Sequence, residues 1–147
     1  MQHCSSSIFL LFLSNLESIL KPIFLGECYR SWSLRYLKEA KVDFSVASKA
    51  SMIETVKDLS TIALRKAQLA IQYALAEPEL LDIAVSEYIS KGQIQGEPLI
   101  ILLARIGKTM QDISEPKPRF NRKNILEKTG SVIDVASSIV SECLGKR

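Results

Sequence analysis

The sequence predicts an all-α protein, folded as an up-and-down bundle of about five or six helices. Hydrophobic residues recur at three- and four-residue steps through most of the chain, which is the period of an amphipathic helix. Only the apolar run 99–104 suits a strand, and it continues in the helical period to Ile113. A chain of 147 residues has the size of one domain, so we expect a single helical-bundle domain over 1–147.

The central element is a helix predicted over Ser51–Ala76. Ser51 and Glu54 have the spacing of a capping box, in which each side chain accepts from the other residue's backbone amide. Behind this cap an apolar stripe follows the helix, and its second half is almost all alanine, so that another helix can approach closely. The stripe consists of Ile53, Val56, Leu59 or Ser60, Ala63, Ala67, Ala70 and Ala74. Polar residues such as Gln72 are expected off the stripe.

A long helix is predicted immediately before it, over residues 28–50. Leu37, Ala40, Phe44 and Ala47 share one face, and Trp32 with Tyr36 widens this face. Because the connection to Ser51 is very short, we expect an antiparallel hairpin over 28–76, formed by Tyr29–Ala50 and Ser51–Ala76.

Residues 1–26 are the most apolar section. They are predicted to form a first, peripheral bundle helix, with a break at Pro22, that packs on the others or on a partner subunit. The apolar run 8–13 is far shorter than the ~20 residues that span a bilayer, so no membrane span is expected. A secretory signal would require Lys or Arg before this run, and residues 1–7 contain neither. A membrane-associated anchor and a mis-assigned upstream start are the alternatives.

Three further helices complete the prediction, separated by segments rich in glycine, proline and charge. The helices are expected over Glu79–Ile89, from Pro98 to Ile113, and over Asn124–Leu144, with loops at Lys91–Gly96 and Ser114–Asn121. In the last helix Gly130 is a weak point, worth about 1 kcal/mol relative to alanine. The inner face of that helix is predicted to contain Ile125, Thr129, Val132 or Ile133, Ala136, Ile139 or Val140, and Cys143.

The composition excludes several kinds of function. The net charge of +3 is too small to indicate a nucleic-acid binder by itself. Cys4, Cys28 and Cys143 are far apart and odd in number, so we expect no disulfide framework and no metal site, and a reducing, cytoplasmic location is the simplest interpretation. With His3 as the only histidine, histidine-based metal sites and acid–base triads are improbable.

One basic segment, KPRFNRK at 117–123, stands out as a candidate binding site. Four cations surround one aromatic residue, which is the combination that contacts phosphates and stacks on a base. The candidate residues are Lys117, Arg119, Phe120, Arg122 and Lys123. A solvated loop whose phenylalanine enters the core is the alternative. Arg65 and Lys66 are a second candidate, although adjacent helical residues point about 100° apart, which favours a solvated face.

Motifs of catalysis are missing from the sequence. It contains no GxGxxG, no GxxxxGK[ST] and no GxSxG, and no Glu-x-x-His pair. Glu77 and Glu79 flank Pro78, where the positive end of a helix dipole already explains their charge. We therefore expect no enzyme, no catalytic residue and no cofactor.

The hairpin resembles the conserved helix pair of HEPN domains. Their first helix has a tryptophan followed by a Leu-x-x-Ala-x-x-Asp-Leu-x-x-Ala pattern, and the second is centred on Ala-x-Gln-Ala. The matching residues here are Trp32, Leu37, Ala40, Asp43, Phe44 and Ala47, then the segment Ala63–Ala74 with Ala67, Gln68 and Ala70. The resemblance covers about 45 residues.

The resemblance implies an all-helical bundle, often dimeric, of a family that includes ribonuclease toxins, nucleotidyltransferase partners and RNA-binding modules. Its ribonucleases use an arginine followed four to six residues later by a histidine, and no arginine of this chain has such a histidine. We therefore expect a non-catalytic HEPN-like homodimer that binds nucleotide, RNA or a nucleotidyltransferase, in a toxin–antitoxin-type system. The alternative is a structural adaptor bundle that binds only protein.

Overall fold

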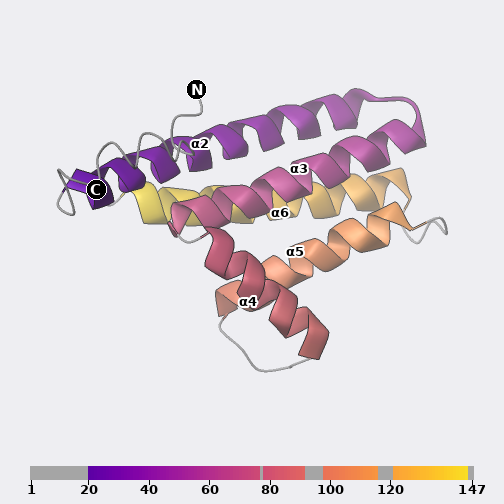
Figure 1. The fold of residues 1–147 in the computed structure, drawn as a ribbon. Helices are drawn as coiled ribbons and strands as arrows, with labels where there is room; N and C mark the ends of the chain where they lie inside the picture. The colour runs from indigo at the N-terminus through magenta and orange to yellow at the C-terminus, as the bar shows by residue number, and fades with distance from the viewer. Residues whose placement is uncertain (1–19, 77, 92–97, 116–120, 146–147) are drawn as a thin grey trace.

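The computed structural model describes residues 20–76, 78–91, 98–115 and 121–145, and this part of the chain is an all-α bundle, as predicted. It contains five helices and no strand. In chain order they are α2 (Leu20–Lys49), α3 (Ile53–Ala74), α4 (Pro78–Lys91), α5 (Pro98–Ser114) and α6 (Arg122–Gly145). In Figure 1 α2 and α3 lie antiparallel, α6 runs along both, and α4 and α5 project from α3.

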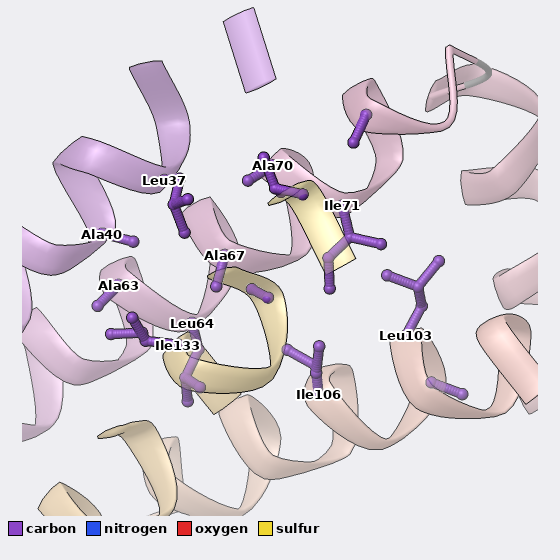
Figure 2. Close-up of a cluster of buried hydrophobic side chains, with 14 of the residues drawn as sticks. Leu37, Ala40, Ala63, Leu64, Ala67, Ala70, Ile71, Leu103, Ile106 and Ile133 are labelled. Atoms are coloured by element: carbon purple, nitrogen blue, oxygen red, sulfur yellow. The ribbon is translucent and has the colours of Figure 1, made fainter. Parts of the chain in front are cut away.

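The core is built around α3, which packs against every other described helix. Alanines on α3 and on the facing part of α2 have no exposed surface, so the two backbones come close together; they are Ala40, Ala63, Ala67 and Ala70. Figure 2 shows Leu64 and Ile71 of α3 among side chains from α5 and α6, such as Ile106 and Ile133. Burial of this apolar surface is the main stabilising term of the bundle.

The buried arc of α3 is wider than the predicted stripe. Gln68 and Gln72 are buried in addition to the alanines, although Gln72 was expected outside the stripe. Conversely, Ile53 was expected inside and is 41% exposed. The reason is that α4 and α5 cover a second side of α3. The hydrophobic pattern of α3 alone does not indicate that these later helices pack there.

The predicted hairpin is present, but its predicted capping box is not. α3 begins at Ile53 after Met52, and no side chain caps its first turn, while Ser51 lies in the exposed connection. The connection is instead held by backbone bonds, from Ala50 N to Ala47 O and from Val56 N to Met52 O. Farther along, the buried Ser33 hydroxyl donates to Ala70 O at 2.7 Å and ties the two helices together.

The main correction to the predicted elements is at the start of α2. Residues 20–26 belong to this helix and not to a separate first helix. Pro22 causes no break because a proline in the first turn lacks only an amide that has no partner inside the helix. Residues 1–19 and the predicted loop residues 92–96 and 116–120 lie outside the described part.

The other predicted helices are confirmed, with ends that differ by a few residues. The apolar run 99–104 is helical within α5, not a strand. Leu144, rather than Cys143, is buried at the end of α6, together with the predicted Ile125, Thr129, Ile133, Ala136 and Val140. Asn121 caps α6, since its side-chain oxygen accepts from Asn124 N at 2.9 Å.

Two further findings concern the cysteines and the membrane. Cys28 is disulfide-bonded, contrary to the expectation from sequence, whereas Cys143 is a free, half-buried thiol. Among the described residues no helix combines the length and apolar character needed to cross a bilayer.

Candidate interaction surface

The basic segment predicted as a binding site is only partly described. Lys117, Arg119 and Phe120 lie outside the described residues, and Lys123 is exposed on the first turn of α6. Arg122 donates one hydrogen bond to Ala50 O and another, of 2.8 Å, to Ser48 O. These carbonyls belong to the end of α2, where the helix itself supplies no donors. Arg122 therefore caps α2 and is not directed toward a ligand.

An equivalent contact joins the opposite ends of the same two helices. Arg30 of α2 donates from Nη1 to Leu144 O at 2.8 Å, at the end of α6. Because α2 and α6 are antiparallel, each helix provides a guanidinium for the negative end of the other. We refer to Arg30 and Arg122 as the arginine caps.

Lys66, from the second basic candidate, is neutralised by α2. Its ammonium lies 3.1 Å from Glu39 Oε1 and 2.8 Å from Asp43 Oδ2. These partners, led by the hydrogen bond to Asp43, raise the pKa of Lys66 above 10.5. Arg65 is separate from this group, because it bonds Gln68 Oε1 and lies 3.7 Å from Asp82 of α4. The structure thus brings neither cation to an open phosphate site.

Four aromatic side chains gather where α2 and the end of α3 meet, and the sequence reasoning did not identify this group. Ring centroids lie 5.6 Å apart for Tyr29 and Tyr73, 5.6 Å for Trp32 and Tyr36, and 5.5 Å for Tyr36 and Tyr73. All four are half-buried. Burial raises the pKa of Tyr73 above 10.0, so its phenol stays protonated in neutral solution. The spacing of Tyr29, Trp32 and Tyr36 along one helical stripe was the available signal.

Next to the aromatic group lies a cluster of paired charges. Arg35 stacks over Trp32, with its guanidinium carbon 5.2 Å from the ring centroid, and donates to Glu39 at 2.8 Å. Glu39 and Asp43 also bind Lys66, so two cations face two carboxylates. With Lys38 and Val42 these residues line a shallow depression of about 370 Å³.

Beside the ion pairs, and one helical turn beyond them, the surface becomes aliphatic. Val42 and Val46 of α2 and Ile62 of α3 are 54%, 51% and 45% exposed. Val42 lines the depression together with Asp43 and Lys66, whereas Val46 and Ile62 lie three and four residues from these two, on the same side of their helices. We define the hairpin surface as three parts. The aromatic end consists of Tyr29, Trp32, Tyr36 and Tyr73, and the ionic centre consists of Arg35, Glu39, Asp43 and Lys66. The aliphatic end consists of Val42, Val46 and Ile62.

The hairpin surface combines aromatic, ion-paired and aliphatic side chains, a composition typical of contact regions. It contains no histidine or cysteine, and its carboxylates are already paired with cations. Within the described ranges no group of three or more potential metal ligands occurs. Glu79, considered above as half of a carboxylate pair, is exposed in the first turn of α4, and Glu77 lies outside those ranges.

No known protein family matches the chain, and neither a characterised protein nor a solved structure matches it.

Proposed function

We propose that the protein is a non-catalytic helical interaction module that binds a second copy of itself through the hairpin surface. The observation that carries this proposal is the aromatic end with Arg35 stacked on it. Tryptophan, tyrosine and arginine are the residues that contribute most binding energy in protein interfaces. Here the half-buried aromatic side chains and the exposed Arg35 lie together, beside exposed aliphatic side chains.

The sign of the charge favours protein over nucleic acid at this surface. A groove that binds single-stranded RNA needs a net positive field, because each phosphate contact releases counterions. Among the residues that line the depression, Arg35 and Lys66 are matched by Glu39 and Asp43, and Lys38 leaves a net charge of only +1. The aromatic end alone provides stacking without an electrostatic attraction for phosphate.

A second copy fits because the surface is self-complementary about its centre. A two-fold axis through the ionic centre would bring the cations of one protomer to the carboxylates of the other. The same axis would pack the aromatic end of each protomer on the aliphatic end of its partner. From Tyr29 to Val46 the contact would extend ~26 Å along α2, at 1.5 Å per residue.

The proposal is tested by light scattering and sedimentation velocity on the purified protein. Val46→Glu places a charge on the aliphatic end and should give a folded monomer, whereas the wild type should be a dimer. Leu34→Glu is the matched control: Leu34 has a similar exposure of 45% on the same helix, but helical spacing turns it away from the hairpin surface. We expect this variant to remain dimeric.

Trp32 is the only tryptophan of the chain and provides an independent readout. Its fluorescence emission should shift to shorter wavelength as the concentration rises through the dimerisation range, and Val46→Glu should abolish the shift. A wild type that stays monomeric at every concentration, or a Val46→Glu variant that stays dimeric, would reject the proposal.

Nucleotide or RNA binding through the basic segment is the second candidate, and the exposed Lys123 favours it. It also follows from the resemblance to HEPN domains. Since Arg122 caps α2, the variant should replace Lys117, Arg119 and Lys123 with alanine and retain Arg122. We expect this variant to lose binding of a fluorescein-labelled single-stranded RNA. The exposed cations Lys49, Lys91 and Arg105 provide a matched triple-alanine control, and equal binding by both variants would exclude the segment.

A further inference from the structure

The joint between α3 and α4 has a strained backbone. Ala76, which follows the C-cap residue Leu75 of α3, has a φ of 62°, and no other non-glycine residue in the described part of the chain has a positive φ. Its amide donates to Tyr73 O at 3.0 Å, so this left-handed turn ends the helix. Glycine is the usual residue at such a position, because the Cβ of an L-residue raises the free energy of the left-handed conformation.

A buried polar group at the same joint lacks one partner. Gln72 of α3 has no exposed surface, and its Nε2 donates to Asp82 Oδ1 of α4 at 2.8 Å. Its Oε1 is buried without a hydrogen-bond partner among the described residues. Water would satisfy this oxygen if α4 moved away, and the side chain of Asp82, which is 52% exposed, already has access to water. The closed joint therefore combines two unfavourable features, the φ of Ala76 and the unsatisfied oxygen of Gln72.

Few apolar contacts of α4 oppose these two features. Val85 is the only buried residue among the described side chains of α4. Leu81 and Tyr88 are half-buried against the core, and Ile83 and Ile89 are 58% and 57% exposed. In contrast, α5 has buried residues from its middle to its end. Local openings of a native protein occur in the elements with few buried contacts, so α4 is the described helix that loses least by leaving the bundle.

We propose that α4 is a strap that undocks from α3 and α5 at the Ala76 joint while α2, α3, α5 and α6 stay folded. Undocking lets Ala76 leave the left-handed region and lets water reach Gln72 Oε1. In Figure 1 α4 projects from the end of α3 and lies beside α5, so its departure uncovers apolar surface of these two helices. This device is separate from the hairpin surface, and neither proposal depends on the other.

The undocked helix should unfold, which makes the opening measurable. α4 has 14 residues, and isolated helices shorter than about 12–15 residues are marginal in water. Its backbone amides therefore lose their hydrogen bonds on undocking and exchange with solvent hydrogen. Amides of the other helices stay protected until the whole chain unfolds.

The first test is native-state hydrogen exchange of the full chain at increasing, sub-denaturing urea concentrations. We expect the central amides of α4, at 84–88, to be about tenfold less protected than those in the middle of α5, at 104–108. Their exchange should hardly depend on urea, because local opening exposes little surface. Protection in α4 that equals that in α5, or exchange that rises as steeply with urea, would overturn the proposal.

The second test assigns the opening to the joint. Ala76→Gly removes the strained φ and Gln72→Met removes the unsatisfied oxygen, so each should raise the protection of α4 about two- to fivefold. Ser60→Ala is the matched control. Ser60 Oγ is also buried without a partner among the described residues, but it lies ~18 Å from Gln72 along α3 and stays covered when α4 leaves.

The control variant should therefore leave the protection of α4 unchanged, whatever its effect on the stability of the whole chain. Two results of this comparison would overturn the proposal. One is unchanged α4 protection in either Ala76→Gly or Gln72→Met. The other is a change in Ser60→Ala as large as that in the two joint variants, because α4 would then exchange only when the whole chain unfolds.

Discussion

At the scale of single residues, a basic side chain in a promising motif turns out to have a structural role. Arg122 belongs to the segment that looked most like a phosphate site, yet its guanidinium binds Ser48 O and Ala50 O. Lys123, its neighbour in sequence, is exposed and makes no such contact. The charge pattern is the same for both residues, so the difference between them comes only from the tertiary position of α2.

This difference gives a stability prediction. Arg122→Ala should lower the free energy of unfolding by about 1–2 kcal/mol, because two carbonyls at the end of α2 lose a charged donor. Lys123→Ala should change it by less than about 0.5 kcal/mol, as expected for an exposed residue. Urea titration followed by circular dichroism measures both. Equal effects of the two substitutions would contradict the capping role.

Two buried glutamines of α3, one turn apart, lead to opposite predictions. Gln68 Nε2 donates to Leu103 O at 2.9 Å and its oxygen accepts from Arg65, so both ends of the amide are bonded. Gln72 Nε2 donates to Asp82 at 2.8 Å, but its buried oxygen has no partner among the described residues. An unsatisfied buried acceptor costs about 1–3 kcal/mol.

We therefore expect Gln72→Met to raise the free energy of unfolding by about 0.5–1 kcal/mol and Gln68→Met to lower it by about 1–2 kcal/mol. The exposed Asp82 can exchange its lost partner for water, which keeps the first substitution favourable. Thermal and urea denaturation of the two variants and the wild type measure these changes in the free energy of unfolding. A loss of stability in Gln72→Met comparable to that in Gln68→Met would show that the Gln72 amide is fully satisfied.

At the scale of helices, the period of the hydrophobic residues was enough to predict α3 to α6 within a few residues of their ends. Helix ends were less predictable, because they depend on contacts that are remote in sequence. The Ser51 and Glu54 pattern did not form a cap, since backbone bonds already close the short connection between α2 and α3. Asn121 does form a cap, and its position just before the last periodic segment was a usable signal.

Gly130 shows how a neighbouring helix changes the meaning of a residue. By propensity alone, alanine at this position should stabilise α6 by about 1 kcal/mol. A methyl group there would lie only 3.1 Å from Phe44 Cζ of α2. We expect the displacement of this half-buried ring to offset the gain, so that Gly130→Ala is nearly neutral.

A double-mutant cycle tests this explanation. In a Phe44→Leu background the ring is absent, and Gly130→Ala should then stabilise the protein by about 1 kcal/mol. Urea titrations of the wild type, the two single variants and the double variant give the coupling energy. A gain of the same size in the presence of Phe44 would mean that α2 and α6 separate without cost at this position.

At the scale of the whole molecule, the fold class follows from the sequence, but the surface that we propose as functional does not. The aromatic end requires Tyr73 to lie beside three residues of α2, and the ionic centre requires Lys66 to lie opposite Glu39 and Asp43. Both depend on the register of the hairpin. That register is set by close alanine packing and by the bond from Ser33 to Ala70 O, which periodicity alone does not specify.

The ionic centre predicts how the stability of the whole bundle depends on pH. Hydrogen bonds from Arg35 and then from Lys66 hold the pKa of Glu39 below its ordinary value of 4.5. A lowered pKa in the folded state means that the ionised carboxylate stabilises the fold above the unfolded-state value. This contribution is lost as the pH falls through the lowered value. The side chain is 36% exposed, so solvent reduces the effect to about 0.5 kcal/mol.

The wild type should therefore be more stable than Glu39→Gln at pH 7, and the difference should disappear as the pH falls below 4.5 toward the lowered pKa. Urea titrations at several pH values measure it. Glu87→Gln is the control, because Glu87 is an exposed α4 residue without an ion pair among the described residues. If the stability difference for Glu39→Gln were constant through the acid range, the stabilisation would come from the shape of the side chain. Lys66 would then hold α3 to α2 through Asp43, without help from the charge of Glu39.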